Sequence, residues 1–344
     1  MTITQAQLAR ELGLSQVAVS HALRGKPGVA DDTRQRVLDA AQRGGYRVSR
    51  LARGMVSGKT QLLDVWMGTK NGVSRTPHNL MQGLQHAAES HDMQVAVSYL
   101  NDDRLTDPDD FPAVFRERAA DGILINYSHL VPERLFELLE RFGIPAVWIN
   151  NKLEHDAVHP DDVRVGEIAA ERFLELGHRR LAMFSLMGGG HYSQADRWQG
   201  FSSVARAAGV EPVAIEQPGG PGLPYRDDPS SDDRIDQLVN RLRNDGAPTA
   251  IFAYAVGEGV ALMTALARLG IDCPKDVSVI VVADEPMPVL LPLPISTVVL
   301  PQQELGQTAV EELMARIDRP ESPRPAVAVA PVYVEARTTA PPPR

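Results

Sequence analysis

The sequence has little cysteine, few aromatic residues and no long apolar run. Its one cysteine, Cys273, can form neither an internal disulfide nor a cysteine-rich metal site, and we expect a structural role for it. No stretch approaches the roughly 18 apolar residues that cross a bilayer, and residues 1–10 lack the basic and then apolar layout of a signal peptide. We therefore expect a cytoplasmic protein with no membrane partner.

Motifs of common enzymes are absent as well. The sequence contains no Walker phosphate loop, no HExxH zinc motif and no dinucleotide-binding fingerprint. A glycine run at residues 188–190 precedes His191, but a flexible loop explains it better than a catalytic phosphate cradle. Acidic and histidine pairs, such as those at 155–156 and 161–162, fit surface charge better than metal binding. The sequence predicts no enzyme activity, no cofactor and no metal.

What is present is the composition of a soluble globular protein, with 43% apolar and 23% charged residues, and 344 residues suffice for two or three domains. The net charge of −9 is unevenly spread. Residues 1–60 hold ten Lys/Arg and four Asp/Glu, a net charge of +6, which leaves −15 on the remainder. A basic head on an acidic body favours a segment that binds the DNA backbone, the alternative being a solvated charged face.

The first 46 residues are typical of a helix-turn-helix. Thr4 and Ser15 are suited to cap helices over residues 5–12 and 16–23, and glycine at the turn allows a tight corner between them. A third helix is expected from Asp31 through Arg43.

Beyond residue 61 apolar strand-like runs alternate with helical stretches, a pattern typical of a parallel α/β fold. Two proline-rich segments, 217–233 and 340–344, are expected to be exposed and mobile. The expected strands are 62–67, 94–99, 122–125, 146–149, 181–184, 250–253 and 277–282. The expected helices are 80–90, 132–142, 165–176, 197–208, 233–244 and 260–269.

Several motifs closely resemble the lactose-repressor/galactose-repressor (LacI/GalR) family of bacterial transcriptional regulators. In the head they are QVAVSHALRGKPGV at 16–29, TRQRV at 33–37 and GY at 45–46. In the remainder they are LGHRRLA at 176–182, RWQGF at 197–201 and GIDCPKDVSVI at 270–280. The resemblance therefore covers nearly the whole chain.

The resemblance implies an all-α helix-turn-helix head on a two-lobed, periplasmic-binding-protein-like core of parallel doubly wound sheets. The implied domains are a head (1–46), a hinge helix or linker (47–60), a core (61–337) and a flexible tail (338–344). The first lobe would be about 61–158 with 290–318, and the second about 159–289 with 319–337. A homodimer would bind a pseudopalindromic DNA operator, acting as a repressor at the bacterial nucleoid.

The resemblance also implies which residues contact DNA. Gln16, Val17 and His21 fall where the family reads bases, and an amide to adenine, a methyl contact to thymine and an imidazole to guanine are chemically reasonable. The residues expected at phosphates are Thr4, Ser15, Ser20, Arg24 and Lys26, with capping an equal alternative for Ser15 and Ser20.

The segment 48–57 resembles the family's hinge helix, which inserts an apolar wedge into the minor groove. Met55 occupies the wedge position, where leucine is usual, and Gly54 weakens the helix by roughly 1 kcal/mol relative to alanine. Ala52 would allow close approach to DNA and Arg53 would add charge, while an inert linker is the alternative.

A small-molecule effector is implied between the lobes, with Arg197 as the main contact. Ala283 and Val256 stand where the family commonly has acids, which disfavours a simple sugar and leaves the effector open. Further candidate contacts, for which core packing is an equal alternative, are Asp284, Tyr127, Asn150, Trp148, Tyr192 and Tyr254.

The competing hypothesis is a solute-binding or sensor protein without ligand-regulated DNA binding, which would share the core but not residues 1–60. The sequence does not determine the operator, the regulated genes, or whether the effector induces or corepresses. A tetramer is not expected, because no leucine heptad precedes the C-terminus.

Overall fold

The computed structural model describes residues 3–46, 58–69, 74, 76–107, 109–117, 119–127, 131–186, 191–216, 242, 246–285 and 293–343. Internal contacts divide the chain into two compact units, Met1–Gln61 and Leu62–Arg344. Among the described residues, no helix combines the length and the apolar character needed to span a membrane.

The first unit contains three helices, α1 (Gln5–Leu12), α2 (Gln16–Leu23) and α3 (Asp31–Arg43), which confirm the predicted ranges. Thr4 caps α1 in a reciprocal capping box with Gln7, and the Ser15 side chain accepts from the Ala18 amide at the start of α2. The three helices bury a small core that includes Leu8, Val19, Ala22, Val37 and Ala40. This core fixes the angle at which α2 leaves the turn.

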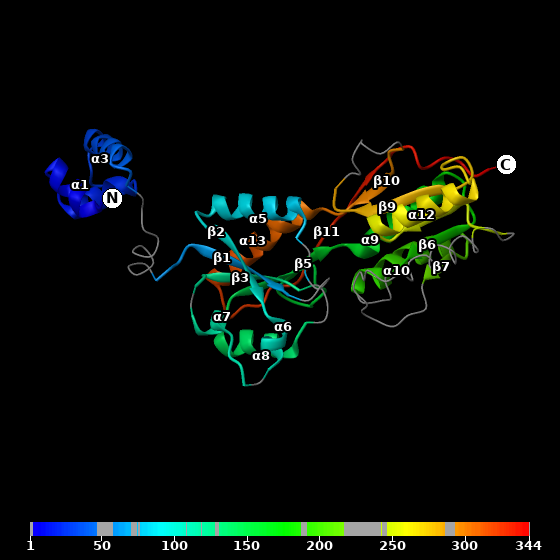
Figure 1. Ribbon diagram of the computed structural model, residues 1–344, viewed down its shortest axis with the longest axis horizontal. Coiled ribbons are helices and arrows are strands. Elements are labelled where there is room, and N and C mark those ends of the chain that lie inside the picture. The colour runs from blue at the N-terminus through cyan, green and yellow to red at the C-terminus, as the bar shows by residue number, and fades with distance from the viewer. Residues whose placement is uncertain are drawn as a thin grey trace. The chain divides into compact units, whose positions relative to one another are not determined.

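The second unit begins with a six-stranded sheet in the order β11-β5-β4-β3-β1-β2. All pairings within it are parallel. The helices α5 (His78–Ser90) and α13 (Gln302–Asp318) pack on one face, while α7 (Ala113–Arg116) and α8 (Glu133–Phe142) cover the other (Figure 1). The strands are β1 (Leu62–Gly68), β2 (Gln94–Leu100), β3 (Gly122–Asn126), β4 (Ala146–Ile149), β5 (Ala157–Pro160) and β11 (Val327–Val329).

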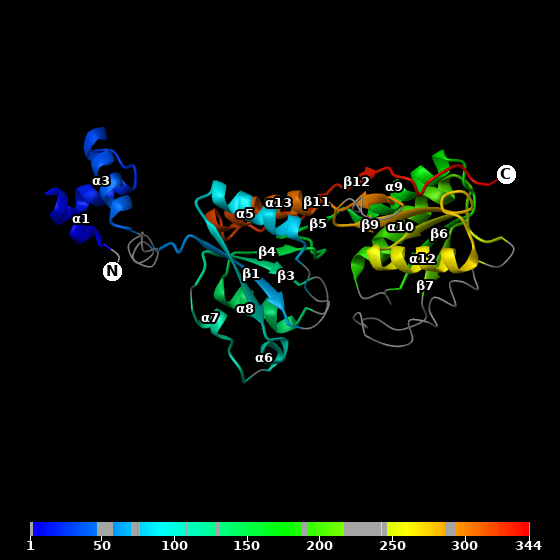
Figure 2. The same ribbon diagram turned by 45° about the horizontal axis from the view of Figure 1, so that its top comes forward.

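A second six-stranded sheet has the order β12-β10-β9-β8-β6-β7. Only the β10–β12 pairing is antiparallel. The helices α9 (Asp162–Glu175) and α10 (Tyr192–Ala207) pack on one face, and α12 (Val256–Leu269) packs on the other (Figure 2). The strands are β6 (Leu181–Ser185), β7 (Val213–Glu216), β8 (Ala250–Ala253), β9 (Ser278–Ala283), β10 (Ser296–Val299) and β12 (Val332–Val334).

The chain crosses between the two sheets at other points than expected. β10 lies within the segment 290–318 that was assigned to the first lobe, yet it pairs with β9 in the second sheet. β11 lies within 319–337, assigned to the second lobe, yet it pairs with β5 in the first sheet. Both strands are only three or four residues long, so their apolar content did not indicate which sheet would take them.

Three helix starts in the second unit were predicted too late. α9 begins at Asp162, α10 at Tyr192 and α12 at Val256, each three to five residues before the expected start. The first turns of α9 and α10 are polar and are capped by Asp161 and His191, so they carry little of the apolar period used for prediction. The expected segments 217–233 and 233–244 lie outside the described residues, apart from residue 242.

The expectation of a mobile tail over residues 338–344 is wrong for its first part. Thr338 is fully buried, and its hydroxyl donates to the Val279 carbonyl. The Val279 amide in turn donates to the Thr338 carbonyl. The Ala340 carbonyl accepts from the Ser278 hydroxyl at 2.9 Å and lies 2.9 Å from His178 Nε2. Proline content predicted mobility, but backbone and hydroxyl pairing with β9 fixes residues 338–340.

Candidate DNA interface and effector site

The exposed face of α2 carries the predicted base-reading residues. Val17 is 64% exposed, a large apolar side chain without cover, and Gln16 beside it is exposed. His21 follows one turn later and is half-buried. Val19 and Ala22 occupy the opposite face and are buried in the head. The helix therefore presents an amide, an apolar branch and an imidazole on its outer side, the groups that read base edges.

The predicted phosphate-contacting residues surround this face. The Thr4 and Ser15 side chains serve as helix caps, so the capping alternative holds for Ser15. Arg24 and Lys26 are exposed in the turn after α2, and Ser20 is half-buried. Arg34 donates to the Lys26 carbonyl at 2.9 Å and so ties that turn to α3. The hinge candidates Ala52, Arg53 and Met55 lie outside the described residues.

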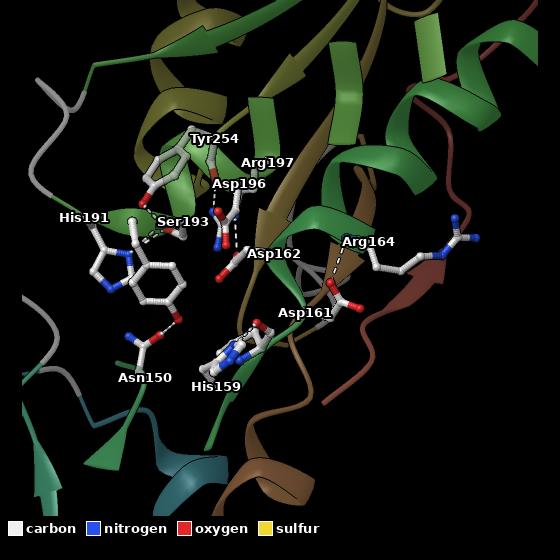
Figure 3. Close-up of polar contacts among 12 residues, drawn as sticks. Asn150, His159, Asp161, Asp162, Arg164, His191, Ser193, Asp196, Arg197 and Tyr254 are labelled. Atoms are coloured by element: carbon white, nitrogen blue, oxygen red, sulfur yellow. Dashed lines mark hydrogen bonds and ion pairs between the residues drawn. The ribbon is translucent and has the colours of Figure 1, made fainter. Parts of the chain in front are cut away.

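The second candidate site is a buried polar cluster around Arg197 on α10 (Figure 3). Arg197 is only 5% exposed. Its Nε donates to Asp162 Oδ1 at 2.8 Å, its Nη1 donates to the Tyr254 carbonyl at 2.7 Å, and its guanidinium lies over the Tyr254 ring. Asp162 is the first residue of α9, and Tyr254 follows β8. The site therefore joins the start of one helix, the first turns of another and the end of a strand.

The charges in this cluster are held in a poorly solvated environment. Burial raises the pKa of Asp162, and the nearby Arg197 charge opposes that rise. Burial alone would lower the pKa of Arg197, but Asp162 together with Tyr254 and Tyr192 outweighs it, so that the pKa of Arg197 is raised. Burial also raises the pKa of Glu258, whose Oε1 accepts from the Leu186 amide at 3.1 Å. Removing either member of the Asp162–Arg197 pair would leave an uncompensated buried charge.

Two further contacts place residues of the first lobe next to this cluster. The Tyr192 hydroxyl donates to Asn150 Oδ1 at 3.2 Å, and Lys152 Nζ pairs with Asp196 Oδ2 at 2.6 Å. Asn150 adopts a left-handed backbone conformation with φ of 57° directly after β4. Asn150 and Lys152 belong to the first sheet's connections, whereas Tyr192 and Asp196 start α10. The polar cluster therefore lies where the two lobes meet.

The structure brings four of the seven predicted effector residues together, namely Arg197, Tyr254, Tyr192 and Asn150. Asp284 lies elsewhere, after β9, and accepts from Gln302 Nε2 at 2.7 Å. The remaining two, Tyr127 and Trp148, are packed in the first-lobe core.

The core positions of Tyr127 and Trp148 follow from their partners. Tyr127 is fully buried and its hydroxyl donates to Asp102 at 3.0 Å. Trp148 is 5% exposed and stacks on Phe136. Their place near strand ends suggested a pocket, but large aromatic rings there also fill the space between sheet and helix.

Sequence reasoning missed three polar members of this region. Asp162 was interpreted as surface charge, yet it is 2% exposed. The Ser193 hydroxyl lies 2.7 Å from the Tyr254 hydroxyl, and Ser193 is 1% exposed. Glu258, at 5% exposure, was not singled out. The sequence offered one signal, for Glu258: it stands among small apolar residues at the start of α12, where a solvated carboxylate is unusual.

Comparisons with known proteins agree with this architecture. Residues 170–339 match the model of the periplasmic binding protein-like domain family. The regulator AglR of Rhizobium meliloti is 27% identical over 302 residues, covering 85% of this chain and 80% of its own. The transcriptional repressor PurR of Actinobacillus pleuropneumoniae is 25% identical over 323 residues, covering 91% of each chain. Both are named as helix-turn-helix-type transcriptional regulators.

Solved structures extend the likeness over head and core. The lac repressor dimer bound to operator and the anti-inducer ONPF matches with a TM-score of 0.74 at 18% identity, covering 99% of this chain and 100% of its own. A LacI family regulator from Mycobacterium smegmatis matches with a TM-score of 0.63 at 25% identity, covering 82% of this chain and 99% of its own. With a helix-turn-helix head, two doubly wound sheets and relatives named as transcriptional regulators along most of its length, the chain is similar to the LacI-type transcriptional regulators in sequence and in fold.

Proposed function

We propose that the protein represses transcription by binding a pseudopalindromic DNA operator as a homodimer, with an affinity set by a small molecule bound at the cluster around Arg197. The observation that carries this is the outer face of α2. There a 64% exposed valine lies beside an exposed amide on a helix whose other face is buried in the head. A branched apolar side chain beside an exposed amide, on the outer face of a helix in a basic segment, is suited to contact a thymine methyl in the major groove.

A homodimer is supported by apolar side chains on the edge of the first sheet. β2 ends that sheet, and its Val97 and Tyr99 are 43% and 65% exposed. An edge strand with uncovered apolar residues favours association with another chain. A two-fold dimer supplies two heads for two half-sites, which one chain cannot do. Sedimentation should give a dimer for the wild type and a weakened one for Tyr99→Ser.

The relatives support an effector without identifying it. Three solved relatives are described in complex with cellobiose, with ribose and with the anti-inducer ONPF, respectively. In this chain Ala283 and Val256 stand where the family commonly has acids, and Arg197 is hydrogen-bonded to Asp162 and to the Tyr254 carbonyl. The cluster at the lobe junction is nevertheless well suited to sense a ligand, because its contacts connect the two lobes.

DNA binding is tested by fluorescence anisotropy on the DNA upstream of the protein's own gene, beside a scrambled duplex, at several salt concentrations. We expect preference for the specific duplex and a linear fall of log affinity with log salt. The double variant Val17→Ala, His21→Ala should lose that preference but keep salt-dependent non-specific binding. Gln35→Ala, an exposed position on α3, is the matched control and should bind as the wild type does.

If the wild type shows no preference on its own upstream DNA, selection from a genomic library with and without candidate ligands extends the search. Absence of any selected site would refute the DNA-binding function and leave the sensor hypothesis. A selected site to which the double variant binds as well as the wild type would refute the assignment of base reading to α2.

A further inference from the structure

One buried carboxylate oxygen in the Arg197 cluster has no hydrogen-bond partner among the described residues. Asp162 is only 2% exposed; its Oδ1 accepts from Arg197 Nε, whereas no described group donates to its Oδ2. Figure 3 shows the Asp162 carboxylate between Arg197 and the side where His191, Asn150 and His159 lie. A buried carboxylate oxygen left unbonded costs about 1–3 kcal/mol or more, so this oxygen is suited to accept from a group that arrives from outside.

The charged form of Asp162 is incompletely stabilised by its surroundings. Burial raises the pKa of Asp162 most and the nearby Asp196 charge adds to that rise, while Arg197 and His159 oppose it. Among the described residues, Arg197 pairs with Asp162 and Lys152 pairs with Asp196. Burial also raises the pKa of Glu258, which favours its neutral form. A cation that reached Asp162 Oδ2 would stabilise the charged carboxylate.

Part of the Arg197 guanidinium is already engaged within the protein. Its Nε donates to Asp162 and its Nη1 donates to the Tyr254 carbonyl, and its Cζ lies 4.5 Å from the centre of the Tyr254 ring. An incoming carboxylate or phosphate would lie beside the Asp162 carboxylate, which repels it. A positively charged group is therefore better suited than an anion to approach Oδ2.

We propose that the effector is an amine-bearing small molecule whose primary ammonium donates to Asp162 Oδ2. This inference rests on the proposed function, in which the cluster is the effector site, and it adds the chemical class of the effector. Arg197 acts as a positioning residue, because it holds Oδ1 and thereby orients Oδ2. A neutral hydroxyl would form a weaker bond to the carboxylate than a charged donor does, and a quaternary ammonium would supply positive charge but no N–H donor.

The test uses one-carbon probes that isolate these properties, added to the full chain. Methylammonium chloride carries charge and N–H donors, tetramethylammonium chloride carries charge alone, methanol carries a hydroxyl, and sodium formate carries a negative charge. All are compared at equal concentration, with ionic strength balanced by sodium chloride. The midpoint of thermal unfolding is the readout, because a ligand that binds only the folded state raises it.

We expect methylammonium to raise the midpoint above the other three probes, by about 1 °C when its concentration equals its Kd. That increment should vanish in Asp162→Asn. It should persist in Asp102→Asn, the matched control, because Asp102 is equally buried but its oxygens already accept from Thr69 and Tyr127. If Asp162→Asn does not fold, the comparison of methylammonium with tetramethylammonium in the wild type still decides.

An equal or larger shift with methanol, formate or tetramethylammonium overturns the inference, as does no shift with any probe. A methylammonium shift that survives in Asp162→Asn overturns it as well. The DNA-binding assay without probes is independent of all these results. Loss of the amine inference with operator binding intact therefore leaves the proposed function standing, whereas loss of operator binding removes the function itself.

Discussion

Replacing Gly200 with alanine tests whether α9 and α10 pack backbone to backbone beneath the candidate effector site. A Cβ built on Gly200 would lie 1.9 Å from the Val163 carbonyl oxygen, and one on Gly166 would lie 2.0 Å from the Arg197 carbonyl oxygen. Both neighbours are helix backbone, which cannot rotate away as a side chain can. The two glycines therefore allow the helices to approach at the level of Asp162 and Arg197.

The expected cost follows from the displacement that alanine would require. An ordinary contact to a methyl carbon is about 3.5–4 Å, so α9 and α10 must separate by more than 1 Å around Val163. Overpacking of a tight core costs typically about 1–3 kcal/mol, and because the obstacle here is backbone we expect the upper end, about 3 kcal/mol or more. The same shift would lengthen the 2.8 Å Asp162–Arg197 bond, one turn away on α10.

Urea unfolding followed by circular dichroism measures this free energy. Gln199→Ala, the adjacent exposed position on α10, is the control and should change stability by no more than about 0.5 kcal/mol. If Gly200→Ala is as stable as this control, the helices do not meet at these glycines and the close packing that places Asp162 beside Arg197 is refuted.

Three other substitutions test the core and the head. Burial raises the pKa of Glu258, so the folded chain keeps a proton that the unfolded chain releases and stability falls as pH rises above about 4.5. Glu258→Gln should remove that fall. The difference between the urea midpoints of this variant and the wild type should therefore grow as pH rises, and a difference that stays constant or shrinks would contradict the expectation. Thr338→Val should cost about 1–3 kcal/mol by removing the buried hydroxyl bonds to Val279 and Ser296, which thermal or urea unfolding measures. In anisotropy titrations, replacing operator thymines with uracil should weaken the wild type but not Val17→Ala, and equal weakening of both would exclude the methyl contact.

The head could be predicted from sequence because its signals are local. Caps at Thr4 and Ser15 and a glycine turn fix the ends of α1 and α2 within a few residues, and no distant segment competes with them. The long apolar strands of the core were found for a similar reason, since parallel strands buried on both faces give continuous apolar runs. Their ends differed by only one residue in β1, β2 and β3.

The remaining elements depend on partners that are distant in sequence. β5 and β10 are four residues each, too short for a periodic signal, and they are strands because neighbouring strands hydrogen-bond to them. α13 was missed as a helix, although its segment was expected to return to the first lobe. The fixed position of residues 338–340 likewise depends on β9, about 60 residues earlier. Local composition contains no information about such pairings.

The charge of the group that would meet the effector also depends on a residue that is distant in sequence. Arg197 was expected to offer a guanidinium to the ligand, and this would favour an anionic or hydroxylated effector. In the structure that guanidinium is bound by Asp162, 35 positions earlier, and by the Tyr254 carbonyl, so the group without a hydrogen-bond partner among the described residues is a carboxylate oxygen. The ligand therefore meets the opposite charge from the one that the arginine alone suggests. Because the pair is buried, neither partner can turn away without exposing an unpaired charge to the core, and this holds the carboxylate in place as the group that selects the effector.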